Sequence, residues 1–398
     1  MAKILFTWEF GLGAGHISPY LTLIKKLEQE GHQVFFAVKC LSKAHQLFKD
    51  TNVTYIQAPT GIAPESLHIG QVLNYPQILH NGGYADVKRL TGLIKAWRNL
   101  FDLIKPDLLV CDYSPTALLA AKENTFKRLR IGTGFYTPTD ITPNLGFATL
   151  IGQKQNQGEL TKIEDNILKT INQALIVNKL KPLSTINEMH KADACLFRTF
   201  PELDHYPDRE NGNYVGICES PPGLKPNWPN GSGPKIFIYT KPFPNLPKFF
   251  EYLEAKKYPC LIYPDGLPTE LIKHFSSKTL KFVDKPLDMK MIGKTADLGI
   301  CNGNHGTVSE LLLSGTPILT LPLHIEQYIV SLNIEKLGAG LSVPDLRADS
   351  MSLKLDQIIQ QDKFSDAAKS FSNKYDDFNS ETLTHSLLDS VHELVNRK

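Results

Sequence analysis

The sequence of 398 residues lacks the features that would indicate a secreted, zinc-binding or membrane-spanning protein. Its six cysteines are scattered, form no CxxC pair and mostly lie within apolar runs, which is typical of reduced core residues. No apolar run approaches the roughly 20 residues that cross a bilayer. The apolar stretch Ile4–Phe6 near the N-terminus is too short for a signal peptide. We therefore expect a cytoplasmic protein whose association with membranes is at most peripheral.

An excess of charge of one sign is also missing. Lys and Arg number 43 against 41 Asp and Glu, which gives a formal net charge of +2. This balance creates no field strong enough to attract nucleic acid, so we expect no nucleic-acid partner. Small ligands stay open as partners, and the sequence does not indicate an oligomeric state.

What the sequence does contain is a steady alternation of β-rich apolar runs with amphipathic helical patterns. This alternation is typical of parallel sheets covered by helices on both faces. The first half predicts strands at Lys3–Thr7, Gln33–Val38, Val53–Ala58, Asp107–Asp112, Arg130–Phe135 and Ala194–Thr199. The second half predicts strands at Lys235–Tyr239, Cys260–Tyr263, Leu280–Val283, Asp297–Cys301, Pro317–Leu321 and Gly340–Val343. Helices are expected at Pro19–Glu30, which Gly31 ends, and at Leu93–Ile104 and Thr161–Val177.

A run rich in Pro, Gly and Asn, ESPPGLKPNWPNGSGP at 219–234, interrupts the alternation. Such a composition is typical of an exposed connection, and chains of this length usually divide into two domains. We therefore predict domains over 1–218 and 235–380, a linker over 219–234, and a C-terminal helix over 381–398 that can pack back on the first domain. Each domain is expected to be a doubly wound, Rossmann-like α/β unit, with the two facing across a cleft. In such sheets ligands bind beyond the carboxyl ends of the strands.

The loop after the first predicted strand carries Gly11, Gly13 and Gly15, followed directly by His16. Glycines at alternate positions let the backbone turn tightly and let a ligand approach. The GxGxxG spacing of dinucleotide loops is not met, because the third glycine comes one residue early, and no GK[ST] motif of a P-loop follows. The loop places an imidazole at a helix start, where it can act as a general base or simply cap or pack.

The fourth predicted strand ends in Asp112, at the carboxyl edge of the same sheet as His16. A carboxylate there can accept the Nδ1 hydrogen of His16, fix its tautomer and stabilise the imidazolium once the ring has taken up a proton. The competing interpretation of Asp112 is an N-cap for the helix that starts at Pro115. Together the two residues favour the general-base interpretation of His16.

The most informative part of the second half is the sequence CNGNHGT at 301–307. A buried strand leads there into a Gly/Asn-rich turn and a helix that opens at Gly306 and Thr307. Unpaired backbone N–H groups and the positive helix end converge at this point, which suits an anion such as a diphosphate. Thr307 and Glu310 also fit a capping box, which would serve only to start the helix. Further polar groups, Glu326 and Gln327, follow the next predicted strand.

In their order along the chain, these motifs resemble the donor-binding signature of family 1 glycosyltransferases, which include bacterial macrolide and plant secondary-product enzymes. The signature comprises the Gly-Thr turn with Glu310 three residues later, Gly-x-Pro at 315–317, an apolar strand, acid-Gln at 326–327 and Leu-Gly-Ala-Gly at 337–340. The GHISP loop at 15–19 resembles their N-terminal motif. FPELD at 200–204 with NYVG at 213–216 resembles the segment before their interdomain linker.

The resemblance implies a GT-B fold with an N-terminal acceptor-binding domain and a C-terminal nucleotide-sugar donor-binding domain. It implies an inverting, metal-independent transfer of a sugar from a UDP- or TDP-type donor to a hydroxyl of a small, lipophilic acceptor. His16 would be the base, oriented by Asp112. No cofactor and no metal are expected, since the helix end and hydrogen bonds neutralise the departing diphosphate. The implied donor contacts are Gly13, Gly15, Thr240, Val283, Asn302, Gly303, Asn304, His305, Gly306, Thr307, Glu310, Glu326 and Gln327.

The implied roles within this set differ. Gly306 and Thr307 would hold the diphosphate, Glu310 the ribose hydroxyls, and Glu326 and Gln327 the hydroxyls of the sugar. The backbone near Val283 would meet the base.

Several positions depart from the family pattern. Asn302 stands where many relatives have a phosphate-contacting histidine, and its neutral amide can donate a hydrogen bond but carries no charge. His305 can compensate or can face solvent. Glu326 replaces the more common Asp, and the strand before Lys241 does not end in Gly-Ser. Asn302 therefore leaves open a catalytically degenerate homologue that binds nucleotide as an auxiliary or sensor protein. A nucleotide-sugar epimerase also stays open, because it shares the two-domain architecture.

Overall fold

The computed structural model describes residues 1–398 except 12, 14, 208, 219–222 and 397–398. The chain forms two compact units. The first comprises Met1–Pro201, Tyr206–Cys218 and Ser380–Lys398, and the second comprises Glu202–His205 and Glu219–Asn379. The first four residues of the predicted linker, 219–222, lie outside the described residues. No helix in the described part of the chain is long and apolar enough to cross a membrane.

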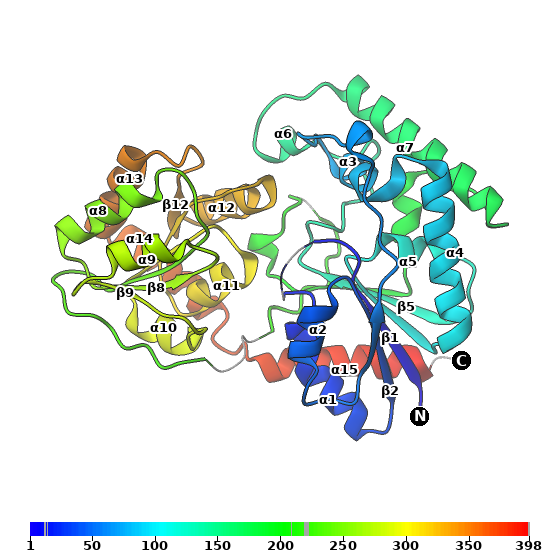
Figure 1. Cartoon of the computed structure of the whole chain (residues 1–398), viewed down its shortest axis with the longest axis horizontal. Helices are drawn as coiled ribbons and strands as arrows, with labels where there is room; N and C mark the ends of the chain where they lie inside the picture. Colours follow the sequence, from blue (N-terminus) through cyan, green and yellow to red (C-terminus); the bar gives the residue numbers. More distant parts are fainter. Residues whose placement is uncertain (12, 14, 208, 219–222, 397–398) are drawn as a thin grey trace. The chain divides into compact units, whose positions relative to one another are not determined.

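The first unit is built on a six-stranded parallel sheet in the order β3-β2-β1-β4-β5-β6 (Figure 1). Its strands are β1 (Lys3–Thr7), β2 (Gln33–Val38), β3 (Thr54–Gln57), β4 (Leu108–Asp112), β5 (Lys127–Gly132) and β6 (Ala194–Phe197). The strand order reverses between β1 and β4. In a doubly wound sheet the loops after such a pair of strands diverge, and the crevice between them is the usual ligand site.

The helices of this unit cover both faces of the sheet. The longer ones are α1 (Leu21–Gln29), α2 (Leu41–Leu47), α3 (Tyr75–Leu79), α4 (Val87–Ile104), α5 (Pro115–Ala120), α6 (Phe147–Leu150), α7 (Gln157–Val177) and α15 (Ser380–Asn396). Short helical turns are η1 (Ser18–Tyr20), η2 (Glu65–Leu67), η3 (His80–Tyr84), η4 (Ile186–His190) and η5 (Pro201–Leu203), whose last two residues belong to the second unit.

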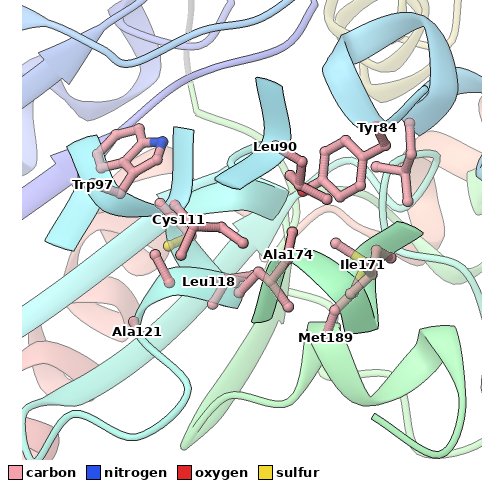
Figure 2. Close-up of a cluster of buried hydrophobic side chains, with 14 of the residues drawn as sticks. Tyr84, Leu90, Trp97, Cys111, Leu118, Ala121, Ile171, Ala174 and Met189 are labelled. Atoms are coloured by element: carbon pink, nitrogen blue, oxygen red, sulfur yellow. The ribbon is translucent and has the colours of Figure 1, made fainter. Parts of the chain in front are cut away.

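Alternate side chains of each strand point to opposite faces of the sheet and so join two separate apolar layers. Ile4 and Phe6 of β1 pack with α1 and α15 on one face, whereas Leu5 packs with α4 on the other. Figure 2 shows part of the second layer, in which α4, α5 and α7 meet the strands. The side chains labelled there are Tyr84, Leu90, Trp97, Cys111, Leu118, Ala121, Ile171, Ala174 and Met189.

The C-terminal helix α15 is part of the core of the first unit. Its apolar residues recur every three or four positions, which gathers them on one face of the helix. That face lies in the same layer as α1 and the strands (Figure 1). The residues are Leu383, Leu387, Val391 and Leu394, all buried.

The second unit repeats the plan with a parallel sheet in the order β12-β11-β10-β7-β8-β9. Its strands are β7 (Ile236–Thr240), β8 (Cys260–Pro264), β9 (Leu280–Phe282), β10 (Leu298–Cys301), β11 (Ile318–Thr320) and β12 (Gly340–Ser342). Its helices are α8 (Leu246–Lys256), α9 (Thr269–Phe275), α10 (Met289–Thr295), α11 (His305–Leu313), α12 (Ile325–Leu337), α13 (Ala348–Gln360) and α14 (Lys363–Lys374). The order reverses between β7 and β10, so the ligand crevice of this sheet is expected there.

The predicted class, two doubly wound α/β domains, is confirmed, and all predicted strands are present. The largest error concerns β5, which runs over Lys127–Gly132 and not Arg130–Phe135. Its first residues are basic and therefore do not resemble a buried strand. In the structure Lys127 and Arg128 both pair with Asp193, at 3.8 and 3.4 Å, so their charges stay at the partly exposed end of the strand.

Two predicted helices begin earlier than expected because a polar side chain caps each of them. Asp86 accepts a hydrogen bond from the backbone N–H of Arg89, and α4 therefore starts at Val87 and not at Leu93. Asn156 accepts from the N–H groups of the first turn of α7. Such caps satisfy backbone donors that have no partner within the helix.

Glu9, just beyond β1, is a buried carboxyl group at the start of α5, with 1% of its surface exposed. Its oxygens accept hydrogen bonds from the N–H groups of Ala117 and Thr116, at 2.6 and 3.3 Å. Burial outweighs these bonds and raises the pKa of Glu9 to about 8. Ionisation of Glu9 therefore opposes folding.

We expect Glu9→Gln to reduce the loss of stability at alkaline pH. The folded-state pKa is above the ordinary value of 4.5, so the stability linked to Glu9 is complete below pH 4.5 and is lost as the pH rises through about 8. The shift corresponds to at most about 5 kcal/mol of unfolding free energy. Chemical denaturation between pH 5 and 9 measures it, with the exposed Glu65→Gln as control. Parallel loss of stability in wild type and Glu9→Gln would contradict the assignment.

Candidate active site

His16 and Asp112 meet at the point where the strand order of the first sheet reverses. Nδ1 of His16 lies 3.0 Å from Oδ1 of Asp112, the last residue of β4. The two side chains are 13% and 4% exposed. A carboxylate oxygen can only accept, so Nδ1 carries the hydrogen of the neutral ring and Nε2 keeps its lone pair. The imidazole can therefore take up a proton at Nε2.

The second oxygen of Asp112 is held by two residues that the sequence did not identify. The hydroxyl of Tyr20 donates to Oδ2 at 2.6 Å, and Nη2 of Arg198 donates to it at 3.0 Å. The same guanidinium lies over the Tyr20 ring, 5.0 Å from its centroid, and donates to the carbonyl of Gly15 at 3.3 Å. The one available signal for Arg198 was a basic residue near the carboxyl end of the predicted strand Ala194–Thr199, which in the structure ends at Phe197.

These contacts keep Asp112 ionised. Burial raises the pKa of Asp112, but the charges of His16 and Arg198, with the hydrogen bonds from His16 and Tyr20, outweigh it and bring that pKa below its usual value. The competing interpretation of Asp112 as an N-cap is wrong, because α5 is preceded by Ser114 and its first amides bond to Glu9. Asp112 instead bonds to His16 through Oδ1 and to Tyr20 and Arg198 through Oδ2.

Gly11 is the glycine of the loop that lies against His16. It has a φ of +80°, and a Cβ built there would lie 2.5 Å from Nε2 of His16. Its carbonyl accepts a hydrogen bond from Nζ of Lys39 at 2.9 Å. Gly13 also has a positive φ, +96°, but a Cβ there would meet nothing within 4 Å, and Gly15 is exposed.

Aromatic rings surround His16. Trp8 stacks on the imidazole with the ring centroids 5.3 Å apart, and Tyr113 and Tyr136 lie at 6.3 and 6.4 Å. Trp8 is almost completely buried, and Tyr136 is partly exposed. The base candidate is therefore placed beside apolar ring surfaces, which favour an apolar or aromatic ligand.

The loops over 61–84 and 136–159, which are rich in Gly, Pro, Asn and aromatic residues, are joined to each other within the first unit. Asn74, the N-cap of α3, forms an isolated bridge with Gly146, the N-cap of α6 (Figure 1). Asn144 donates from its backbone and side chain to the carboxylate of Glu164 on α7. Because Asn144 also bonds to Asn187, both loops are fastened to the helical layer.

In the second unit, Asn302 lies where the strand order reverses, directly after β10. It is fully buried. Its Oδ1 accepts from the N–H of Lys241 at 2.8 Å, and its Nδ2 donates to the carbonyl of Leu321 at 2.8 Å. Asn302 therefore connects the chain segments that follow β7, β10 and β11. A phosphate contact by this side chain stays a prediction.

The turn after Asn302 has a fixed shape. Gly303 has a φ of +87°, and a Cβ there would lie 2.8 Å from the carbonyl oxygen of Gln327. The amide of Gln327 donates to Oδ1 of Asn304 at 2.7 Å and accepts from the N–H of Leu323 at 2.8 Å. Gln327 thus supports the turn directly, in addition to any contact with a ligand.

Helix α11 begins at His305, so the capping-box interpretation of Thr307 and Glu310 is wrong. The N-cap is Asn304, which makes no side-chain capping bond, and Thr307 is the third residue of the helix. Gly306 is exposed, and a Cβ there would meet nothing within 4 Å. The start of α11 therefore offers an accessible, positively polarised set of backbone N–H groups.

The other predicted donor contacts are distributed along the same edge of the second sheet. Thr240 is buried at the end of β7, next to β10. Glu326 lies in the first turn of α12, after β11, and is partly exposed. Val283 follows β9, three strands from β10, which is about 14 Å across a sheet. The structure thus brings Thr240, Asn302 and Gln327 close together and leaves Val283 apart.

Comparison with solved structures identifies proteins of the same fold. The calicheamicin glycosyltransferase CalG4 superposes with a TM-score of 0.70 and 16% identity, covering 100% of this chain and 98% of its own. The glycosyltransferase VinC, solved in complex with dTDP, gives 0.69 and 15%, with full coverage of both chains. The spinosyn rhamnosyltransferase SpnG, solved with spinosyn aglycone, gives 0.63 and 15%, covering 98% of this chain and 100% of its own.

The chain therefore has the GT-B fold of these glycosyltransferases over its whole length. No protein-family model matches the sequence, and no curated protein matches it. At this level of identity the likeness defines the fold, and function has to be argued from the site.

We expect Gly11→Ala to displace the His16 ring, whereas Gly13→Ala should not. Both substitutions put a side chain at positive φ, which costs about 1–2 kcal/mol of stability. Only the first places a methyl group against Nε2 of His16. NMR signals of the imidazole nitrogens would measure the difference. Identical His16 signals in the two variants would show that Gly11 does not position the ring.

Proposed function

We propose that the protein is an inverting glycosyltransferase that moves a sugar from a nucleoside diphosphate to a hydroxyl of a small, lipophilic acceptor. The observation that carries this proposal is the hydrogen-bonded pair of His16 and Asp112 at the reversal point of the first sheet. Two further observations support a donor-binding site in the second unit: the fold is that of solved glycosyltransferases, and the start of α11 is exposed.

On the acceptor side, Nε2 of His16 removes the proton of the acceptor hydroxyl as its oxygen attacks the anomeric carbon. The bond from that carbon to the diphosphate breaks, and its electron pair leaves with the nucleotide. Asp112, kept ionised by Tyr20 and Arg198, stabilises the imidazolium that forms. Attack from the side opposite the leaving group inverts the anomeric centre.

On the donor side, the backbone N–H groups at the start of α11 bind the diphosphate, with Thr307 adding a hydroxyl donor. Gly306 lets the phosphate oxygens approach the backbone closely. Developing negative charge on the leaving group is then stabilised by the helix end without a metal ion. Glu310 and Glu326 are assigned to hydroxyls of the ribose and the sugar, as the family pattern implies.

Two observations support the substrate classes. The rings of Trp8, Tyr113 and Tyr136 beside His16 suit an apolar acceptor with a hydroxyl group. Among proteins of this fold, SpnG was solved with spinosyn aglycone and VinC with dTDP, which makes dTDP-sugars the donors to test first. UDP-sugars are tested next, because the family resemblance includes them.

We expect His16→Ala to bind nucleotide almost as wild type does and to turn over about 100-fold more slowly or worse, the usual scale for a lost general base. Thermal shift with UDP and dTDP measures binding, because a ligand of the folded state raises its stability. Release of free nucleotide from the sugar donors measures turnover. His45→Ala, which removes a surface histidine bonded to Tyr55, is the control. Unchanged turnover in His16→Ala would reject the mechanism.

A binding-only function is the second candidate, because the Asn302 side chain is neutral, buried and bonded to the protein. Such a protein would be stabilised by nucleotide but would release none from any sugar donor. An epimerase would instead change the sugar without an acceptor, which NMR of the recovered donor detects. These three results are mutually distinguishable.

A further inference from the structure

Three side chains with metal-binding atoms meet at the amino end of the first sheet. Glu30 and His32 lie in the turn between α1 and β2, and His392 lies on α15. Their candidate ligand atoms all lie within 4.8 Å of one another, and no other such group of three occurs among the residues that the structure describes. His16 and Asp112 occupy the carboxyl edge of the same sheet, so this cluster is separate from the candidate active site.

We propose that Glu30, His32 and His392 bind one divalent transition-metal ion, with zinc as the best fit, and that the ion fastens the C-terminal helix to the first unit. Two imidazole nitrogens and one carboxylate oxygen form a donor set that suits zinc and its neighbours in the first transition row. Three protein ligands leave one position of a tetrahedral ion for water.

The distances are close to those that a metal requires. Oε2 of Glu30 lies 2.7 Å from Nε2 of His392 and 3.7 Å from Nε2 of His32. Zinc bonds of about 2.0–2.1 Å in a tetrahedral arrangement place neighbouring ligand atoms about 3.3 Å apart. Rotations of the Glu30 and His392 side chains bring these two distances toward that value.

The three side chains differ in their freedom to adjust. His32 is 12% exposed, and its Nδ1 accepts a hydrogen bond from the N–H of Ala2 at 3.2 Å, which directs Nε2 toward Glu30. Glu30 and His392 are 37% and 38% exposed and can move to meet an ion. When Nε2 of His32 binds the metal, the ring proton lies on Nδ1 and the Ala2 bond is lost. The Ala2 amide is therefore a local reporter of binding.

Without a metal, the same contacts are a half-exposed carboxylate shared by two histidines, and exposed ion pairs of this kind contribute little to stability. The apolar residues of α15 already hold the helix in the core. A bound ion adds a link near the end of α15 that hydrophobic packing does not provide. This inference does not depend on the proposed transferase function, because neither the site nor its test involves catalysis.

Full-length protein, treated with EDTA and dialysed, is titrated with Co²⁺ and then with Zn²⁺. We expect one Co²⁺ per chain with visible absorption of low coordination number, its displacement by Zn²⁺, and a higher melting temperature with either ion. Zn²⁺ should also slow hydrogen exchange in the last turns of α15 and shift the Ala2 amide signal.

His392→Ala should weaken Co²⁺ binding by about 100-fold or more, since even outer-shell changes at metal sites cost 10–100-fold. The control is His385→Ala, an exposed histidine seven residues earlier on the same helix, about 10 Å along its axis. Both variants should melt like wild type in EDTA, because both side chains are at least partly exposed. Absence of saturable Co²⁺ binding, or equal affinity in His392→Ala and His385→Ala, overturns the proposal.

Discussion

Asp112 is an ionised carboxylate inside the protein, and much of the candidate active site depends on how that charge is accommodated. A buried charge is tolerated only when it is paired and hydrogen-bonded. Here the partners are His16 after β1, Tyr20 in η1 and Arg198 after β6. Satisfying one carboxylate therefore joins three segments that are far apart in the sequence: the stretch from His16 to Tyr20, the end of β4 and the residue after β6. Arg198 and Tyr20 hold one oxygen and leave the other to His16, so the network also sets the tautomer of the ring.

At the reversal point of the second sheet, the buried polar side chain is neutral. Asn302 occupies the equivalent place after β10, and it needs only the Lys241 N–H and the Leu321 carbonyl to be satisfied. A charged side chain in the same buried place would need a counter-ion that these two backbone groups cannot supply. In the proposed function, compensation of a diphosphate is left to the start of α11, whose N-cap residue Asn304 is bonded to Gln327. In the proposed function, the reversal point of the first unit carries out proton transfer and that of the second binds an anion.

The sequence predicts the strands of this fold well because buried parallel strands are continuous apolar runs, and β5 was misplaced because Lys127 and Arg128 give its first residues the character of a loop. The pairing of His16 with Asp112 was predictable because carboxyl ends of adjacent parallel strands share one edge of a sheet. The contact of Gly11 with His16 was not, since a close approach across a loop depends on its three-dimensional path. The helix was predicted to open at Gly306 and Thr307, but α11 begins at His305. Gln327, from the next helix, holds the N-cap Asn304 in position, and the local sequence gives no sign of that contact.

The path of the chain connects the candidate active site to the C-terminus. Apart from the short stretch Glu202–His205, the chain stays in the first unit until Cys218 and returns to it at Ser380, so one continuous core is made from both ends of the sequence. Four apolar side chains of α15 pack in the same layer as Ile4 and Phe6 of β1, and β1 leads directly into the loop that carries His16. Each buried side chain of this kind contributes about 1.5–3 kcal/mol, and a domain is stable by only about 5–15 kcal/mol in total. Removal of α15 would therefore take away a large part of the stability of the sheet that positions His16, even though the helix lies on the opposite side of β1 from Leu5 and α4. A metal ion bound between α15 and the turn before β2 would stabilise the packing of α15 against α1 and the sheet, and the stability of the first unit depends on that packing.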